Sequence, residues 1–84
     1  MDDKTELLSN LEKIHTTPLG KERIKRNLCL DVDDVIHWCK QKIKTPKSAI
    51  HRNGKNFYIA IDKCIITVNA SSYTIITAKK ISHP

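Results

Sequence analysis

The sequence predicts an α+β fold in which three N-terminal helices pack on one face of a four-stranded antiparallel β-meander. Up to about Thr45, apolar residues recur at the three- and four-residue spacing of amphipathic helices. From Ser48 onward they alternate with polar residues, which is the pattern of strands that bury one face. Turn sequences such as Asn53-Gly54 separate the alternating stretches. With 84 residues the chain has room for a single domain, residues 1–84.

Helices are predicted at about residues 3–15, 18–27 and 32–44. The first carries an apolar stripe that includes Leu7 and Ile14. Thr17-Pro18 begins the second, because proline is tolerated in the first helical turn and threonine can accept a hydrogen bond from a free amide. Asp31 is expected to cap the third helix.

Strands are predicted at about residues 48–52, 55–61, 64–69 and 72–80. The turn Asn53-Gly54 is the strongest short hairpin signal, because both residues tolerate positive φ. With these two residues as the turn, His51 faces Asn56.

Two further turns extend the register across the sheet. Asp62-Lys63 places Ile59 opposite Ile66, and the next turn places Ile66 opposite Ile75. Every step keeps the same face apolar, and this consistency supports the register.

The opposite, uncovered face of the sheet is polar at one end. One predicted row contains His51, Asn56, Asn69 and Ser72, and the next contains Tyr58, Thr67 and Thr74. Arg52, Lys55 and Lys79 are predicted at the margins of this face. An antiparallel sheet exposes such residues to water even without a function. An imidazole beside hydroxyls and amides, surrounded by cations, can also bind a phosphodiester and transfer a proton.

The charge balance favours an anionic partner, most commonly nucleic acid. The chain has 15 Lys and Arg against 9 Asp and Glu, which gives a formal net charge of +6. The second predicted helix carries a candidate phosphate-binding patch of Lys21, Arg23, Lys25 and Arg26. The same charges can serve solubility alone, and the sequence leaves both explanations open.

Metal, cofactor and membrane functions find no support in the sequence. Three widely spaced cysteines without a CxxC pair argue against a disulfide framework and a zinc site. The histidines, His15, His37, His51 and His83, fit no metal-ligand spacing. The chain has no glycine-rich nucleotide motif, no apolar run near the roughly 20 residues of a membrane span, and no secretory signal pattern. We therefore expect a cytoplasmic protein without metal or cofactor.

The stretches HTTPLGKERIKRNL and GKNFYIAIDKCIITVNASSYTIITAKK resemble a small bacterial and phage-associated family known as a domain of unknown function. The two stretches and the interval between them cover most of the chain. A more distant, fold-level similarity is to the barnase, EndoU, colicin and RelE-like ribonucleases. In that group, helices precede a four-stranded antiparallel meander whose open face holds the active site. The similarity implies a metal-independent ribonuclease of the toxin or mobile-element type.

For such an activity, the candidate catalytic residues are His51, His15, Tyr58 and Thr74. Either histidine would act as general base or acid, while Tyr58 and Thr74 would orient the phosphate. The candidate contacts to nucleic acid, with RNA as the expected partner, are Lys21, Arg23, Lys25, Arg26, Arg52, Lys55, Asn56, Asn69 and Lys79.

Two functions without catalysis are open as well. The protein can be a phage or mobile-element inhibitor that binds a nucleic-acid-processing enzyme, because a sheet without Glu offers the histidine no evident acid–base partner. It can also be a basic module that binds nucleic acid through charge, with a steep salt dependence. The exposed edge of a four-stranded sheet is compatible with a monomer or an edge-strand dimer.

Overall fold

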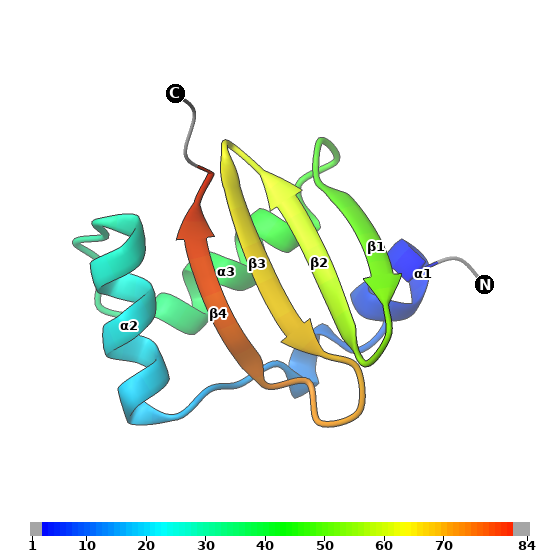
Figure 1. The fold of residues 1–84 in the computed structure, drawn as a ribbon, viewed down its shortest axis with the longest axis horizontal. Helices are drawn as coiled ribbons and strands as arrows, with labels where there is room; N and C mark the ends of the chain where they lie inside the picture. Colours follow the sequence, from blue (N-terminus) through cyan, green and yellow to red (C-terminus); the bar gives the residue numbers. More distant parts are fainter. Residues whose placement is uncertain (1–2, 82–84) are drawn as a thin grey trace.

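The computed structural model describes residues 3–81 and shows an α+β fold with a four-stranded antiparallel sheet (Figure 1). The strands lie in the order β1-β2-β3-β4, so each pairs with its neighbours in the sequence. The α-helices are α1 (Asp3–Leu8), α2 (Pro18–Leu28) and α3 (Val35–Lys44), with a short 3-10 helix, η1 (Leu11–Lys13). The strands are β1 (Ala49–Asn53), β2 (Asn56–Ile61), β3 (Cys64–Asn69) and β4 (Ile75–Lys80).

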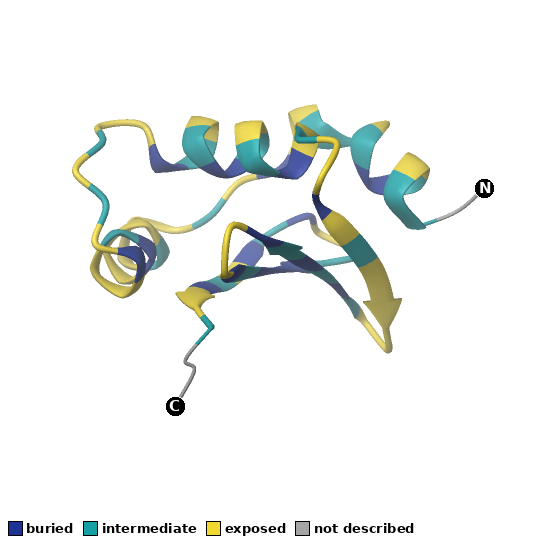
Figure 2. Ribbon diagram, turned by 90° about the horizontal axis from the view of Figure 1, so that it is seen from above, coloured by how far each residue is buried: buried dark blue, intermediate teal, exposed yellow. Residues whose placement is uncertain are grey.

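Helices α1 and α3 lie over one face of the sheet, whereas α2 lies beside the edge strand β4 (Figures 1 and 2). The single helical layer expected from the sequence is therefore incomplete. The cause is the segment before α2, because residues 14–16 run alongside the start of β4 and bring the chain into the helix at the sheet edge. The face of the sheet away from α3 is called the open face below.

The first helix is shorter than the apolar pattern predicts. It ends at Leu8 instead of continuing to residue 15, and His15 is extended beside the sheet. Ser9 donates its hydroxyl to the carbonyl four residues earlier at 2.9 Å. The Thr5 carbonyl also accepts the N–H of Ser9, so the helical pattern is still intact at this point. It ends at Asn10, whose side-chain amide donates to the Glu6 carbonyl at 2.8 Å while its N–H donates to the Leu7 carbonyl instead. The stripe is still buried, because Leu7 and Ile14 are both in the core.

Side-chain oxygens cap α2 and α3. Thr17 Oγ1 accepts the N–H of Gly20 at 3.0 Å, which confirms the predicted cap. Asp34, instead of the predicted Asp31, caps α3 by accepting the N–H of His37 at 2.9 Å. The third helix therefore begins three residues later than expected, at residue 35 instead of 32.

The core lies between the sheet and the helices. Its fully buried side chains include Leu7, Ile24, Val35, Ile43, Phe57, Ile59, Ile66, Val68 and Ile75. Cys39 of α3 is buried among them, and this burial raises the pKa of its thiol to about 12. Cys39 therefore stays protonated at neutral pH and acts as a packing residue.

The β1–β2 pairing differs from the predicted register by two residues. Asn53 pairs with Asn56, and His51 pairs with Tyr58 instead of Asn56. Within this turn only Gly54 has positive φ, at 65°, which fits a turn with glycine at its first position. A shift of two residues keeps every side chain on its face, so His51 and Tyr58 still lie on the open face.

The β2–β3 pairing confirms the predicted register. Ile59 lies opposite Ile66, and the two turn residues Asp62 and Lys63 have φ values of 49° and 63°. Two consecutive positive φ values are what a type I′ hairpin turn requires.

The predicted β3–β4 register is wrong. Ile66 lies opposite Ala78 instead of Ile75, and β4 begins at residue 75 instead of 72. An irregularity in the ladder leaves Ile76 as an extra residue between two paired ones, with 48% of its surface exposed. Such a bulge changes which side chains of the strand reach the core, and here it brings Ala78 inward.

Candidate functional site

A row of polar side chains crosses the open face from one edge of the sheet to the other. This polar row consists of Asn53, Asn56, Asn69, Thr74 and His15. Backbone pairing aligns Asn53 with Asn56 and Asn56 with Asn69. The N–H of Asn69 donates to the Thr74 carbonyl at 2.9 Å. An isolated parallel β-bridge pairs Thr74 with His15. Core residues flank the row along the strands, and side chains alternate between faces, so the row faces away from the helices.

His15 is held at the end of the polar row by backbone and side-chain bonds. Its N–H donates to the Tyr73 carbonyl at 3.1 Å, and its carbonyl accepts the N–H of Ile75 at 2.8 Å. Its Nδ1 lies 2.9 Å from the Lys13 carbonyl, and its Nε2 lies 3.1 Å from Thr74 Oγ1. A carbonyl can only accept, so Nδ1 carries the proton and, in the neutral ring, Nε2 accepts the hydroxyl of Thr74.

Two more polar residues extend this contact into a hydrogen-bonded chain. Ser72 Oγ lies 2.8 Å from Thr74 Oγ1 and 3.2 Å from Asn69 Oδ1. A Ser72 hydroxyl that donates to Thr74 instead of Asn69 leaves the Thr74 proton for His15. Asn69 Oδ1 accepts the N–H groups of Ser71 and Ser72, each at 2.9 Å, and so fixes the loop. We call Ser72, Thr74 and His15 the hydroxyl–imidazole chain.

Backbone strain accompanies the hydroxyl–imidazole chain. Tyr73, between its two hydroxyl residues, has a φ of 58°, which is an unusual conformation for a bulky side chain. The ring of Tyr73 is buried and lies 6.3 Å from the Phe57 ring, centroid to centroid. Packing in the core thus holds the strained residue in place. Strain of this kind is concentrated at functional sites, which directs attention to this loop.

A second row on the open face contains His51, Tyr58, Thr67 and Thr77. The rings of His51 and Tyr58 are stacked, with centroids 5.6 Å apart and planes inclined by 22°. Beside them is a hollow of about 260 Å³ lined by His51, Asn53, Tyr58, Ala60 and Ile65.

His15 and His51 are both exposed on the same face but at opposite edges of the sheet. His51 is on β1, and His15 is on the segment outside β4. Neighbouring strands are about 4.8 Å apart, so four strand spacings place the two residues roughly 19 Å from each other. They therefore cannot act as acid and base on the same phosphate group.

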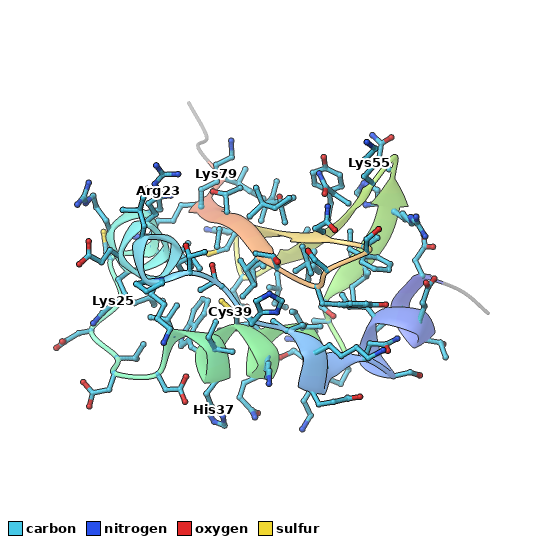
Figure 3. All side chains as sticks on the ribbon, turned by 90° about the horizontal axis from the view of Figure 1, so that it is seen from below. Arg23, Lys25, His37, Cys39, Lys55 and Lys79 are labelled. Atoms are coloured by element: carbon cyan, nitrogen blue, oxygen red, sulfur yellow. The ribbon has the colours of Figure 1, made fainter. Side chains whose placement is uncertain are left out.

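The basic residues divide between the two sides of the molecule. Figure 3 shows Arg23, Lys55 and Lys79 pointing to the side of the open face, whereas Lys25 lies on the side of α3. Lys21 and Arg26 are exposed on α2. Three of the predicted contacts thus surround the open face from α2, the β1–β2 turn and β4.

Arg52 and Asn56 lie differently from the other predicted contacts. The Arg52 guanidinium carbon is 5.9 Å from the centroid of the Phe57 ring, so this side chain lies on the core side of the sheet. The N–H of Arg52 donates to the carboxylate of Asp3 at 2.9 Å, which covers part of the β1 edge that an edge-strand dimer would use. Asn56 Oδ1 is buried and has no hydrogen-bond partner among the described residues.

Within residues 3–81, no group of three or more His, Cys, Asp and Glu side chains lies close enough together to hold a metal ion. His83 is outside the described residues. No helix of this part of the chain has the length and apolar character to cross a membrane.

The hydroxyl–imidazole chain joins the two stretches that carry the family resemblance. His15 begins the first stretch, and Ser72 and Thr74 belong to the second. A family model described as "Protein of unknown function (DUF3781)" matches residues 8–79, a range that includes the first stretch and all of the second except its last residue, Lys80. Neither a curated protein nor a solved structure matches the chain. Because the model spans most of the sequence, the protein belongs to the DUF3781 family of proteins of unknown function.

Proposed function

We propose that the protein is a metal-independent ribonuclease-like protein that acts on RNA through the open face of its sheet, with His15 as its general base. One observation carries this proposal: the Nε2 atom of an exposed imidazole is kept as a hydrogen-bond acceptor by the bond from Nδ1 to the Lys13 carbonyl. A histidine with a fixed tautomer, whose unprotonated nitrogen contacts only a displaceable hydroxyl among the described residues, is suited to removing a proton.

The proposed reaction is the attack of a ribose 2′-hydroxyl on its own 3′-phosphate. His15 Nε2 takes the 2′-hydroxyl proton while the 2′-oxygen bonds to phosphorus. The bond from phosphorus to the 5′-oxygen of the next nucleotide breaks, and that oxygen takes a proton from water. The proton that His15 then releases neutralises the hydroxide, so the base is restored. The products are a 2′,3′-cyclic phosphate and a 5′-hydroxyl. The Thr74 hydroxyl, displaced from Nε2 by the substrate, then donates to a phosphate oxygen.

The basic residues of the open face would contact other phosphates of the same strand. Lys79 is five residues beyond Thr74, a separation of roughly 16 Å along an extended chain. This distance is too large for both to contact the reacting phosphate. Arg23 and Lys79 therefore contribute affinity, and the charge that develops in the reaction is left to the hydroxyls of Ser72 and Thr74.

A second candidate function is binding of RNA, or of a nucleic-acid-processing protein, without cleavage. The observation that favours it is the separation of the two histidines, which leaves His15 without a second titratable side chain in its hydrogen-bond chain. On this alternative, the polar row and the cations around it form a recognition surface.

The deciding experiment is an RNA-cleavage assay with total bacterial RNA and tRNA in excess chelator. The wild-type protein is compared with His15→Gln, which keeps a hydrogen-bonding side chain but cannot act as a base, and with His51→Gln as the matched control. Cleavage at saturating RNA that resists chelator and is lost only in the His15 variant supports the proposal. RNA binding without cleavage by the folded wild-type protein moves the conclusion to the second candidate.

A further inference from the structure

The hollow beside His51 and Tyr58 has the composition of a site for a flat heteroaromatic ring. One wall is the stacked pair of His51 and Tyr58. The remaining lining combines the apolar side chains of Ala60 and Ile65 with the amide of Asn53. Aromatic and apolar surfaces with one polar group that can orient the ligand are typical of small-molecule sites.

We propose that this hollow binds a nucleobase of a single-stranded RNA, stacked against the Tyr58–His51 pair. Bases stack on aromatic side chains in single-strand-binding proteins, because each base has a π face. The Asn53 amide can donate to and accept from the edge of a base, which a purely apolar occupant would not use. This inference rests on the function proposed above, and it adds a subsite to it.

Positive charge at the border of the hollow favours a nucleic acid as the occupant. Lys79 on β4 is paired directly with Ile65, which lines the hollow, and its side chain points to the open face (Figure 3). Lys55 points to the same side from the β1–β2 turn. A base in the hollow would thus have cations on two sides for the phosphates of its strand.

The position of the hollow shows which nucleotide it would hold. Tyr58 is on β2, and His15 is three strand spacings away, so roughly 14 Å separates them. One nucleotide cannot place its ribose at His15 and its base in the hollow. The bound base therefore belongs to a nucleotide away from the cleaved bond, and the strand crosses the sheet between the two positions.

The test uses a series of labelled single-stranded RNAs of about ten nucleotides, a typical length for such binding sites. Each RNA has one abasic site, at a different position in each member of the series. All riboses carry 2′-O-methyl groups, so that binding is measured without cleavage, and affinity is read by fluorescence anisotropy. The expected result is that an abasic site at one position weakens binding by about tenfold. In Tyr58→Val, which removes the ring but retains a strand-forming residue, the same abasic site should have no effect.

Ile76→Ser is the matched control, because Ile76 is an exposed hydrophobic residue that does not line the hollow. Because Ile76→Ser leaves the Tyr58 ring in place, it should retain the position-specific loss of affinity. Thermal unfolding of each variant establishes that it is folded. RNA that binds with no sensitive position, or with the same sensitivity in Tyr58→Val, overturns the base site and leaves RNA binding intact.

Single-stranded DNA of the same sequence is the second arm. The proposal requires RNA to bind at least as tightly, and a clear preference for DNA overturns RNA as the source of the base. Absence of binding to either strand by the folded protein overturns both the subsite and the proposed action on RNA.

Discussion

The two histidines of the open face are the same residue type on the same surface, but their surroundings differ. Both ring nitrogens of His15 have hydrogen-bond partners, at 2.9 and 3.1 Å, and its backbone is bonded to the start of β4. His51 is on an edge strand, and its ring contact is a stack on Tyr58. The first arrangement determines which nitrogen is basic, whereas the second provides an aromatic surface. Position on a polar face therefore does not by itself define a catalytic residue.

The largest effect is expected from removing the base at the His15 end. His15→Gln should lower RNA cleavage by about 10²–10⁴-fold, the usual contribution of a general base, with RNA affinity nearly unchanged. His51→Gln should weaken binding and leave the rate at saturating RNA similar. The measurement is the cleavage rate against RNA concentration for both variants. Equal losses of rate in both variants would show that the two histidines do not differ in role.

The next largest effect is a loss of stability from crowding the segment that contains His15. A Cβ at Gly20 would lie 2.2 Å from Thr16 Oγ1, and that hydroxyl donates to the Ile75 carbonyl at 3.0 Å. Gly20→Ala should therefore destabilise the protein by about 1–2 kcal/mol, because overpacking displaces Thr16. In a Thr16→Ala background the 2.2 Å clash is absent and a 3.2 Å contact with Thr17 Oγ1 remains, which a small shift of that hydroxyl relieves. The same change should then stabilise by up to about 1 kcal/mol through helix propensity.

The measurement for this pair is urea unfolding of the four proteins of the double-mutant cycle. The sign of the Gly20→Ala effect should reverse between the two backgrounds. An unchanged sign would show that the segment before α2 is not tightly packed against the helix, and the rigid description of His15 would fail.

These tests bear on features that the sequence could specify only in part. The β2–β3 register was predictable because Asp62-Lys63 is a two-residue turn between strands whose apolar residues match. The cap at Thr17 was predictable for a similar reason, since Thr followed by Pro is a local signal. Local rules succeed where the determining interactions are local.

The β3–β4 register and the position of His15 depend on interactions between distant residues. The loop before β4 contains Tyr73 in a left-handed conformation, and β4 contains Ile76 in a bulge. Neither tyrosine nor isoleucine is a residue type from which such a conformation is predicted. Ile14 continues a helical stripe, so the pattern predicts that residues 14 and 15 are helical. Their pairing with β4 overrides that preference. His15 and Thr74 could thus be selected singly, but their contact could not be predicted.

A smaller loss of stability is expected from removing the central hydroxyl of the hydroxyl–imidazole chain. Thr74→Val keeps the shape of the side chain and removes the hydroxyl shared by His15 and Ser72. Because both partners are exposed and can bind water, the loss should be about 1 kcal/mol, or roughly 4–8 °C in Tm for a domain of this size. Thr77→Val on the same strand is the control, because no hydrogen bond of its hydroxyl occurs among the described residues, and its Tm should change little.

The smallest effect on the stability of the protein is expected from removing the ring of His51. His51→Ala removes a stacked but exposed ring from an edge strand, so the free energy of unfolding should fall by only about 0.5 kcal/mol. Its effect should appear instead in RNA affinity, because the hollow loses one of the two stacked rings that form its wall. Thermal unfolding and anisotropy on the same preparation measure both quantities. A large loss of stability with unchanged affinity would mean that the stack maintains the β1–β2 hairpin, and the hollow would then lose its role as a base site.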